Sequence, residues 1–163
     1  MPREFPVLLS KGGNNQPDAY GGYEFILNSN GDSDLLFVSG RFQANTRGGL
    51  INPNLGKWIH VAFAIDLESQ TAQFYVNGEP VQTSIASGTF ADINFDVPNK
   101  LYVGVPDPAS DSNRANFDGK MRELMLFNRA LSADEIRTIF SKSARQLIPN
   151  SRPDVERSRN TEA

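Results

Sequence analysis

The sequence predicts an all-β protein, an antiparallel β-sandwich with one short C-terminal helix. Three observations indicate this fold class. Short apolar or alternating runs are separated by clusters of Gly, Pro, Asn and Asp, which is typical of antiparallel strands joined by turns. One run alternates with a period of two, and one stretch near the C-terminus carries helix start signals. With 163 residues, the chain is long enough for one domain with its own core.

The predicted strands follow one another along most of the chain. Segments with the length and apolar content of strands are Phe5–Ser10, Gly22–Asn28, Asp34–Arg41, Lys57–Asp66, Thr71–Asn77, Lys100–Val105 and Lys120–Asn128. Shorter strands are expected within Glu79–Ser84 and Phe90–Phe95.

The run from Thr71 gives the clearest strand signal. Polar residues alternate there with apolar residues that point to one side, namely Ala72, Phe74 and Val76. One face of this strand is therefore expected to be buried while the other meets solvent. Asn77-Gly78 follows directly, and both residue types tolerate a positive φ, which favours a two-residue hairpin turn.

One helix is predicted from Ala133 to about Lys142. Ser132 and Glu135 have the spacing of a capping box. The helix has a short apolar face formed by Ile136, Ile139 and Phe140. We therefore assign residues 1–143 to the sandwich. Residues 144–163 have few large apolar side chains and are interpreted as a polar tail or linker, mostly disordered.

Composition excludes several classes of protein. The formal net charge is −3 and the basic residues are scattered, so nucleic acid is not an expected partner. There is no cysteine, which rules out disulfides and thiolate metal sites. No apolar run approaches the roughly 20 residues of a membrane span. The first residues contain no apolar signal-peptide core.

Seven segments, taken in order, carry a family resemblance: Val7–Gly13, Gly22–Leu27, Gly56–Asp66, Phe74–Gly78, Leu101–Gly104, Phe117–Glu123 and Phe127–Ile136. The first five resemble, in order, a strand ending in Ser-Lys-Gly, the next strand, a Trp-x-His-Val-Ala strand, a Tyr-Val-Asp-Gly hairpin and a strand ending in Gly. The last two together resemble a closing strand and its helix. This is the pattern of laminin-G-like (LamG) domains in the concanavalin A-like lectin/glucanase superfamily. The resemblance implies a jelly-roll sandwich.

Two departures from that family matter. Its domains usually have one or two strands before the Ser-Lys-Gly turn, whereas only six residues precede Val7. We therefore expect an N-terminally truncated sandwich with an open sheet edge, covered by a second copy of the chain or by a missing upstream segment. The second departure is Arg122, where many relatives carry Asp. Because some relatives use acidic residues for a structural Ca²⁺, this residue lowers the expectation of metal binding.

Metal binding is weighed against ordinary turn chemistry. Ca²⁺ takes six to eight oxygen ligands, often from loops rich in Asp and Asn. Asp32 and Asp34 are the candidates for such a structural ion. Asp and Asn in turns also bond their own backbone, and this is the favoured interpretation. No cofactor is therefore predicted.

Catalysis is not predicted either. Glucanases of the superfamily carry closely spaced carboxylates on one strand, because retaining hydrolysis needs two carboxyls about 5 Å apart. The nearest approach here is Asp92 with Asp96, which lacks a third acid. His60 is the only histidine, and it is interpreted as a core or sheet-surface residue rather than a general base. A glycoside hydrolase remains the third alternative.

Sugar binding is the leading hypothesis. Saccharide sites combine aromatic faces with amide, carboxylate and guanidinium groups from loops. Side chains of these kinds lie in or beside the two longest polar loops: Asn14, Asn15, Asp18, Tyr20, Tyr23, Asp107, Asp111, Asn113 and Arg114. For each of them a solvated loop position is the alternative interpretation. Trp58 could also stack on a sugar, but it opens an apolar strand and is interpreted as a core residue.

The function predicted from these features is a non-catalytic carbohydrate-binding domain with a glycan or polysaccharide as partner. The family resemblance implies that it belongs to an extracellular or cell-surface bacterial protein. The alternative is a structural or adhesion domain that contacts protein and binds no sugar.

Overall fold

The computed structural model describes residues 5–12, 21–28, 34–51, 54, 56–108 and 113–147. Their larger sheet contains the strands β1 (Phe5–Lys11), β2 (Tyr23–Leu27), β3 (Leu35–Ser39), β4 (Phe42–Thr46), β8 (Thr83–Ser87), β9 (Leu101–Val103) and β10 (Arg114–Asn116). Their smaller sheet contains β5 (Val61–Asp66), β6 (Thr71–Val76) and β7 (Glu79–Pro80).

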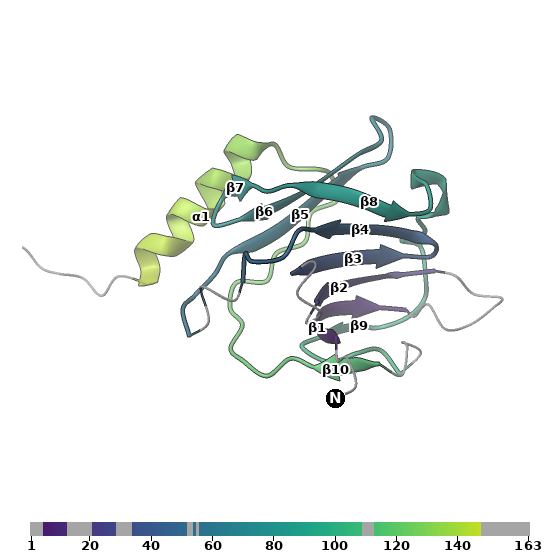
Figure 1. Cartoon of the computed structure of the whole chain (residues 1–163), viewed down its shortest axis with the longest axis horizontal. Helices are drawn as coiled ribbons and strands as arrows, with labels where there is room; N and C mark the ends of the chain where they lie inside the picture. Colours follow the sequence, from purple (N-terminus) through teal and green to yellow (C-terminus); the bar gives the residue numbers. More distant parts are fainter. Residues whose placement is uncertain are drawn as a thin grey trace, which may run out of the picture.

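The two sheets are the layers of a sandwich, and the helix α1 (Ala133–Leu147) lies beside the smaller sheet (Figure 1). The order of strands in the larger sheet is β10-β1-β2-β3-β4-β8, with β9 also paired to β1. The smaller sheet has the order β5-β6-β7. The prediction of an antiparallel β-sandwich with one C-terminal helix is confirmed, although β10 pairs with β1 in parallel.

Aromatic side chains join the two sheets. Phe37 of β3 stacks on Phe63 of β5 with ring centroids 4.5 Å apart, and Phe63 lies 4.4 Å from Phe74 of β6. Phe74 is completely buried, and full burial of such a side chain contributes roughly 1.5–3 kcal/mol. A second cluster on the other face of the larger sheet contains Val7, Ile26, Leu36 and Val38.

The hairpin between β6 and β7 confirms the clearest sequence signal. The side chains of Ala72, Phe74 and Val76 all belong to the cluster between the sheets. Asn77 and Gly78 both have positive φ angles, of 52° and 80°, as a two-residue primed turn requires. The chain then leaves the smaller sheet, and β8 pairs with β4 of the larger sheet.

Two strands were not predicted. The segment expected to form one strand from Asp34 to Arg41 instead forms β3 and a turn at Gly40-Arg41, and the chain returns as β4. The sequence of β4 alternates polar and apolar residues, but only five residues separate the turn from its end, so the signal is short. The second is β10, a three-residue strand held by pairing with β1 rather than by its own apolar content.

Three predicted strands are wrong in whole or in part. The strand expected from Lys57 begins only at Val61. Lys120–Asn128 pairs with no strand among the described residues, and an isolated strand has no ladder to hold it. Phe90–Asp92 forms a turn of 3₁₀-helix, η2, because the carboxylate of Asp92 accepts hydrogen bonds from Thr89 and caps that turn.

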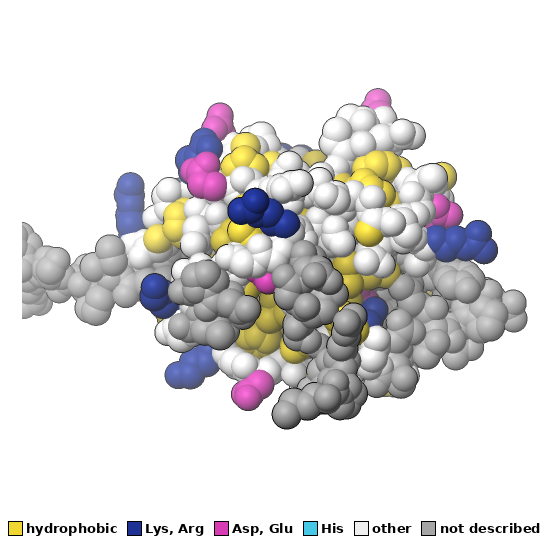
Figure 2. Space-filling model, in the orientation of Figure 1, with side chains coloured by type: hydrophobic (Ala, Val, Ile, Leu, Met, Phe, Trp, Pro, Cys, Tyr) yellow, Lys and Arg dark blue, Asp and Glu magenta, His cyan; other side chains and the backbone are white. Residues whose placement is uncertain are grey.

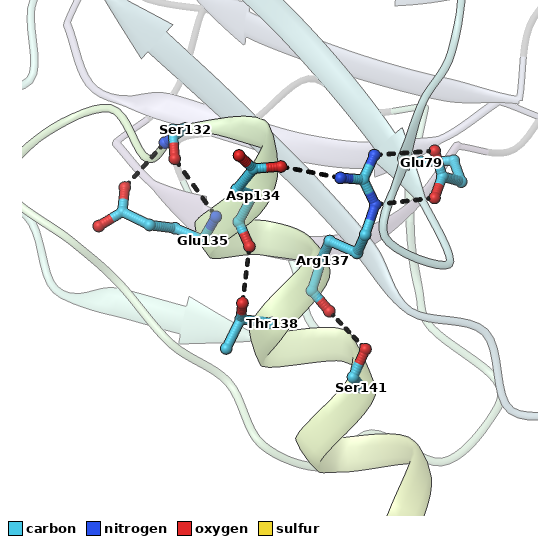
Figure 3. Close-up of polar contacts among 7 residues, drawn as sticks. All are labelled: Glu79, Ser132, Asp134, Glu135, Arg137, Thr138 and Ser141. Carbon is cyan, nitrogen blue, oxygen red and sulfur yellow. Dashed lines mark hydrogen bonds and ion pairs between the residues drawn. The ribbon is translucent and has the colours of Figure 1, made fainter.

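The capping box at the start of α1 is confirmed (Figure 3). The N–H of Ser132 donates to Glu135 Oε2 (2.9 Å), and the N–H of Glu135 donates to Ser132 Oγ (3.3 Å). Arg137 attaches the helix to β7 through Glu79, with Nε–Oε1 3.0 Å apart. The helix continues to Leu147, past its predicted end, because residues 142–147 include the strong helix formers Lys, Ala, Arg, Gln and Leu. The rest of the predicted tail lies outside the described residues.

Candidate functional site

The bases of the two long polar loops meet at Asp107. The N–H of Gly12, where the first loop begins, donates to Asp107 Oδ2 over 3.0 Å. The N–H of Asp107 donates to Ser10 Oγ over 3.2 Å. Asp107 is 5% exposed, so its carboxylate fixes the end of β1 rather than facing solvent. The two loops therefore leave the sandwich from adjacent points.

Arg114 and Glu24 form a buried ion pair beside this junction. Arg114 Nε lies 2.8 Å from Glu24 Oε2, and the two side chains are 6% and 3% exposed. The guanidinium also lies 5.6 Å from the centre of the Phe5 ring. A buried pair loses hydration and is retained only with good geometry. Because Glu24 pairs with Ser10 across β1 and β2, the ion pair and the Asp107 junction belong to one polar network.

Asn113 supplies an exposed amide next to this network. Its Oδ1 accepts a hydrogen bond from Arg114 Nη1 (3.0 Å), and its backbone oxygen accepts one from the N–H of Phe5 (3.1 Å). Three of the predicted binding residues are thus brought together: Asp107, Asn113 and Arg114. The predicted residues Asn14, Asn15, Asp18, Tyr20 and Asp111 lie outside the described residues.

Tyr23 lies on the opposite face of the larger sheet from Glu24. Its ring is stacked 6.3 Å from Phe37 and meets Phe95 edge-on at 5.6 Å. Burial raises the pKa of the Tyr23 hydroxyl. The structure therefore places Tyr23 at the margin of the inter-sheet core, apart from Asp107 and Arg114.

The acidic residues considered for other chemistry have backbone partners. Asp34 Oδ2 accepts hydrogen bonds from the N–H groups of Leu50 and Ile51. Asp32, the other Ca²⁺ candidate, lies outside the described residues. Within the part of the chain that the structure describes, no group of three or more His, Cys, Asp or Glu residues is arranged to hold a metal ion.

Asp92, considered for glucanase chemistry, is held by Thr89. Hydrogen bonds from the backbone N–H and the hydroxyl of Thr89 lower the pKa of this carboxyl. His60 is half-buried with its ring 5.7 Å from Phe140. Burial lowers the pKa of His60, opposed by the nearby charge of Glu123. Among the described residues its buried Nδ1 has no hydrogen-bond partner.

Trp58 is not a core residue, contrary to the prediction. The side chain is 46% exposed, because β5 begins three residues later and Trp58 lies outside the ladder. The guanidinium of Arg122 lies over its ring, 5.9 Å from the centroid. The sequence allowed stacking on Trp58 but favoured a core position, because the apolar neighbours of Trp58 in the sequence indicated burial.

An apolar stretch runs from Met121 to Phe127 and is interrupted by Arg122 and Glu123. Each residue from 121 to 129 is exposed, including Leu124 (53%) and Phe127 (52%).

On the face drawn in Figure 2, Lys and Arg side chains are scattered and form no continuous basic surface. The helix α1, which carries many charged residues, is not suited to crossing a membrane, and the same holds for every other described helix.

The two packed sheets with one C-terminal helix define a β-sandwich domain. The chain belongs to the concanavalin A-like lectin/glucanases superfamily, because the family model Laminin_G_3 matches residues 2–137. The resemblance deduced from the sequence is thereby confirmed.

Two solved structures resemble the fold. One is the CBM40 domain of the Ruminococcus gnavus IT-sialidase, with 15% identity, a TM-score of 0.52, and coverage of 86% of this chain and 76% of that one. The other is an S-layer domain-containing protein from Clostridium thermocellum, with 21% identity, a TM-score of 0.41, and coverage of 84% and 63%. No curated protein matches the sequence significantly.

Proposed function

We propose that this domain binds glycans at a site formed by the two polar loops that leave the sandwich beside Asp107. The hydrogen bond from Gly12 N–H to Asp107 Oδ2 (3.0 Å) carries the proposal, because it anchors both loops at one point. Their combined side chains offer amide, carboxylate and aromatic groups. These are the groups that bind the hydroxyls and C–H faces of sugars.

The buried network supports this proposal as a scaffold. Arg114 and Glu24 are nearly inaccessible, so their role is to hold β1, β2 and β10 in place beneath the loops. Asn113 is exposed next to Arg114 and is the described residue best placed to contact a ligand. Binding residues are commonly located on loops that a folded scaffold positions.

The family and the structural neighbour agree with glycan binding. The superfamily is named for lectins as well as glucanases, and the name of the Ruminococcus gnavus domain identifies it as a carbohydrate-binding module. We further propose a non-catalytic role, since Asp92 caps a turn through Thr89. We also propose an extracellular or cell-surface location, as the resemblance to laminin-G-like domains implies.

Titration calorimetry and a glycan array test this function. We expect binding to at least one polysaccharide or oligosaccharide class. N113A, and N14A combined with N15A, should each weaken it about tenfold, since each removes hydrogen bonds to the sugar. The matched control is N128A, because Asn128 is an equally exposed amide on another segment. Absence of binding across the array would refute the proposal, and an equal loss in N128A would refute the location of the site.

The exposed apolar stretch favours a second function, contact with protein. The run from Met121 to Phe127 leaves large apolar side chains in water, which is typical of interaction surfaces. An adhesion or structural role therefore stays as the alternative, and it is favoured if the array shows no glycan binding while the domain associates with protein.

A further inference from the structure

The described residues leave four sheet edges, and three of them are protected against further pairing. β7 has two residues, one of them Pro80, and Arg137 of α1 binds its Glu79. The edge made by β9 and β10 consists of three-residue strands. β8 pairs with β4 through a register shift. Short strands, proline, charges and bulges are the features by which proteins block edge pairing.

β5 is the fourth edge and has none of these features in its first five residues. It runs for six residues in unbroken register with β6. Its first five residues are Val-Ala-Phe-Ala-Ile, and only Asp66 at its end is charged. A regular apolar edge of this length is a template for another strand.

The backbone groups of β5 that face this edge can be identified. The N–H of Asn77 donates to the oxygen of His60 (2.8 Å), which makes these residues a hydrogen-bonded pair. Bonded pairs alternate in antiparallel sheets, so Ala62 and Ala64 also bond to β6. The residues that alternate with them turn their N–H and C=O groups to the free edge: Val61, Phe63 and Ile65. No described strand or loop bonds to these groups.

The same three residues turn their side chains towards the inter-sheet core. Val61, Phe63 and Ile65 pack against the buried cluster but remain only half-buried themselves. The core therefore ends abruptly at β5, and an added strand with apolar residues at alternate positions would extend it. Exposed apolar surface continues beyond the start of β5. Trp58 lies three residues before the strand, Arg122 lies over its ring, and Arg122 belongs to the apolar stretch.

We propose that β5 pairs antiparallel with β5 of a second copy of this chain, with the two-fold axis between the two Phe63 residues. In this register Phe63 faces Phe63 of the second copy, and Val61 faces Ile65 of the second copy. All outward N–H and C=O groups of one strand then meet acceptors and donors of the other. The interface is isologous, as a closed dimer requires.

Complementary chemistry at the ends of the strand favours a second copy over an unrelated strand. The register sets His60 opposite Asp66 of the second copy, once on each side of the axis. Asp66 is at the start of a turn, where its Oδ1 accepts hydrogen bonds from the N–H groups of Glu68 and Ser69. At both ends of the paired strands, His60, which lies near Glu123 and Phe140 of its own chain, would therefore neighbour the carboxylate of Asp66 of the second copy.

Light scattering coupled to gel filtration gives the first test. The molar mass measured for the wild-type peak should be twice that of the monomer. A62K/A64K should be monomeric, because the register sets position 62 opposite position 64 of the second copy, and the introduced lysines repel each other there. A62E/A64E should also be monomeric alone, and mixing the two variants should restore the dimer. The control S84K/A86K carries the same charges on β8, whose residues 84 and 86 are exposed, and should remain dimeric.

Disulfide trapping tests the register without altering charge. The chain contains no cysteine, so A62C and A64C each introduce a unique thiol. The proposed register sets these positions opposite each other in a non-bonded pair with Cα atoms about 4.5 Å apart. The Cα atoms of residue 62 in the two copies lie roughly 7–8 Å apart, as do those of residue 64, which is too far for a disulfide. Mild oxidation should therefore cross-link a mixture of A62C and A64C, and neither variant alone.

A wild type that stays monomeric at high concentration overturns the proposal. The proposal is also overturned if A62K/A64K remains dimeric, or if A62C alone forms a cross-linked dimer on oxidation. Circular dichroism of each variant identifies a folding defect, and the cysteine variants decide the question if the lysine variant is unfolded.

Discussion

Arg114 is a predicted binding residue that the structure places inside the fold. Its guanidinium is almost fully buried against Glu24, and removing one member of a buried ion pair leaves the other charge poorly compensated. We predict that R114M lowers the free energy of unfolding by about 3 kcal/mol, measured by urea denaturation.

Two variants control this prediction. E24Q/R114M should lose less stability than R114M alone, because the orphaned charge is gone. R137M breaks two ion pairs, with Glu79 and Asp134, of an arginine that is 46% exposed, and it should change stability little. Equal losses in R114M and R137M would show that burial of the pair is unimportant.

Gly78 combines a left-handed backbone with a close neighbour. Its φ is +80°, and a Cβ there would lie 2.9 Å from Phe140 Cδ1 of α1. Gly56 has a similar φ of +78° with nothing within 4 Å. We predict that G56A costs about 1 kcal/mol from backbone strain. G78A should cost about 2–3 kcal/mol, because crowding adds to the strain. Equal thermal unfolding midpoints in the two variants would exclude a tight contact between turn and helix.

Single residues also mark the limit of prediction from sequence. The chemistry of Asp107, Asn113 and Arg114 indicated a polar site, and the structure brings them together. Sequence could not show that Arg114 is buried, because its partner Glu24 is ninety positions away. Whether Trp58 is buried depends on where its strand begins, and alternation alone does not fix that boundary.

Among the elements, the helix cap leads to a pH-dependent prediction. Hydrogen bonds from Arg129, and then from the N–H of Ser132, lower the pKa of Glu135 from 4.5 to about 2. A carboxyl with a depressed pKa stabilises the fold fully above its unfolded value, and this contribution is lost as the pH falls through the folded value.

We therefore predict that the difference in melting temperature between wild type and E135Q is largest above pH 5. It should shrink as the pH falls from about 4.5 to about 2. E68Q is the matched control, since Glu68 is exposed on the turn after β5. A difference for E135Q that stays constant over this range would contradict the role of its charge.

Elements with their own signal were predicted well, and those that depend on a partner were not. β6 and α1 carry alternation and caps within their own sequences. β10 exists only because β1 lies beside it. Lys120–Asn128 has a strand-like sequence yet no partner among the described strands. Pairing is a property of two segments, so one segment's sequence cannot determine it.

For the whole molecule, the proposed glycan site and the open edge lie in different layers. Asp107 and Arg114 belong to the β1 end of the larger sheet, and β5 is the edge of the smaller one (Figure 1). A dimer through β5 would therefore leave both sites free. It would present two binding sites to one polysaccharide chain or surface. Paired weak sites gain avidity of roughly 10²–10⁴ when both can engage.

This separation gives a prediction that combines both proposals. A62K/A64K should bind a short oligosaccharide with unchanged affinity in calorimetry, because no substituted residue lies near the site. The same variant should bind an immobilised polysaccharide at least about tenfold more weakly than wild type, measured by surface plasmon resonance. S84K/A86K should match wild type in both assays. If A62K/A64K is monomeric and yet binds the polysaccharide as tightly as wild type, the dimer does not serve multivalent recognition. If A62K/A64K also binds the short oligosaccharide more weakly, the state of the β5 edge affects affinity at the proposed site.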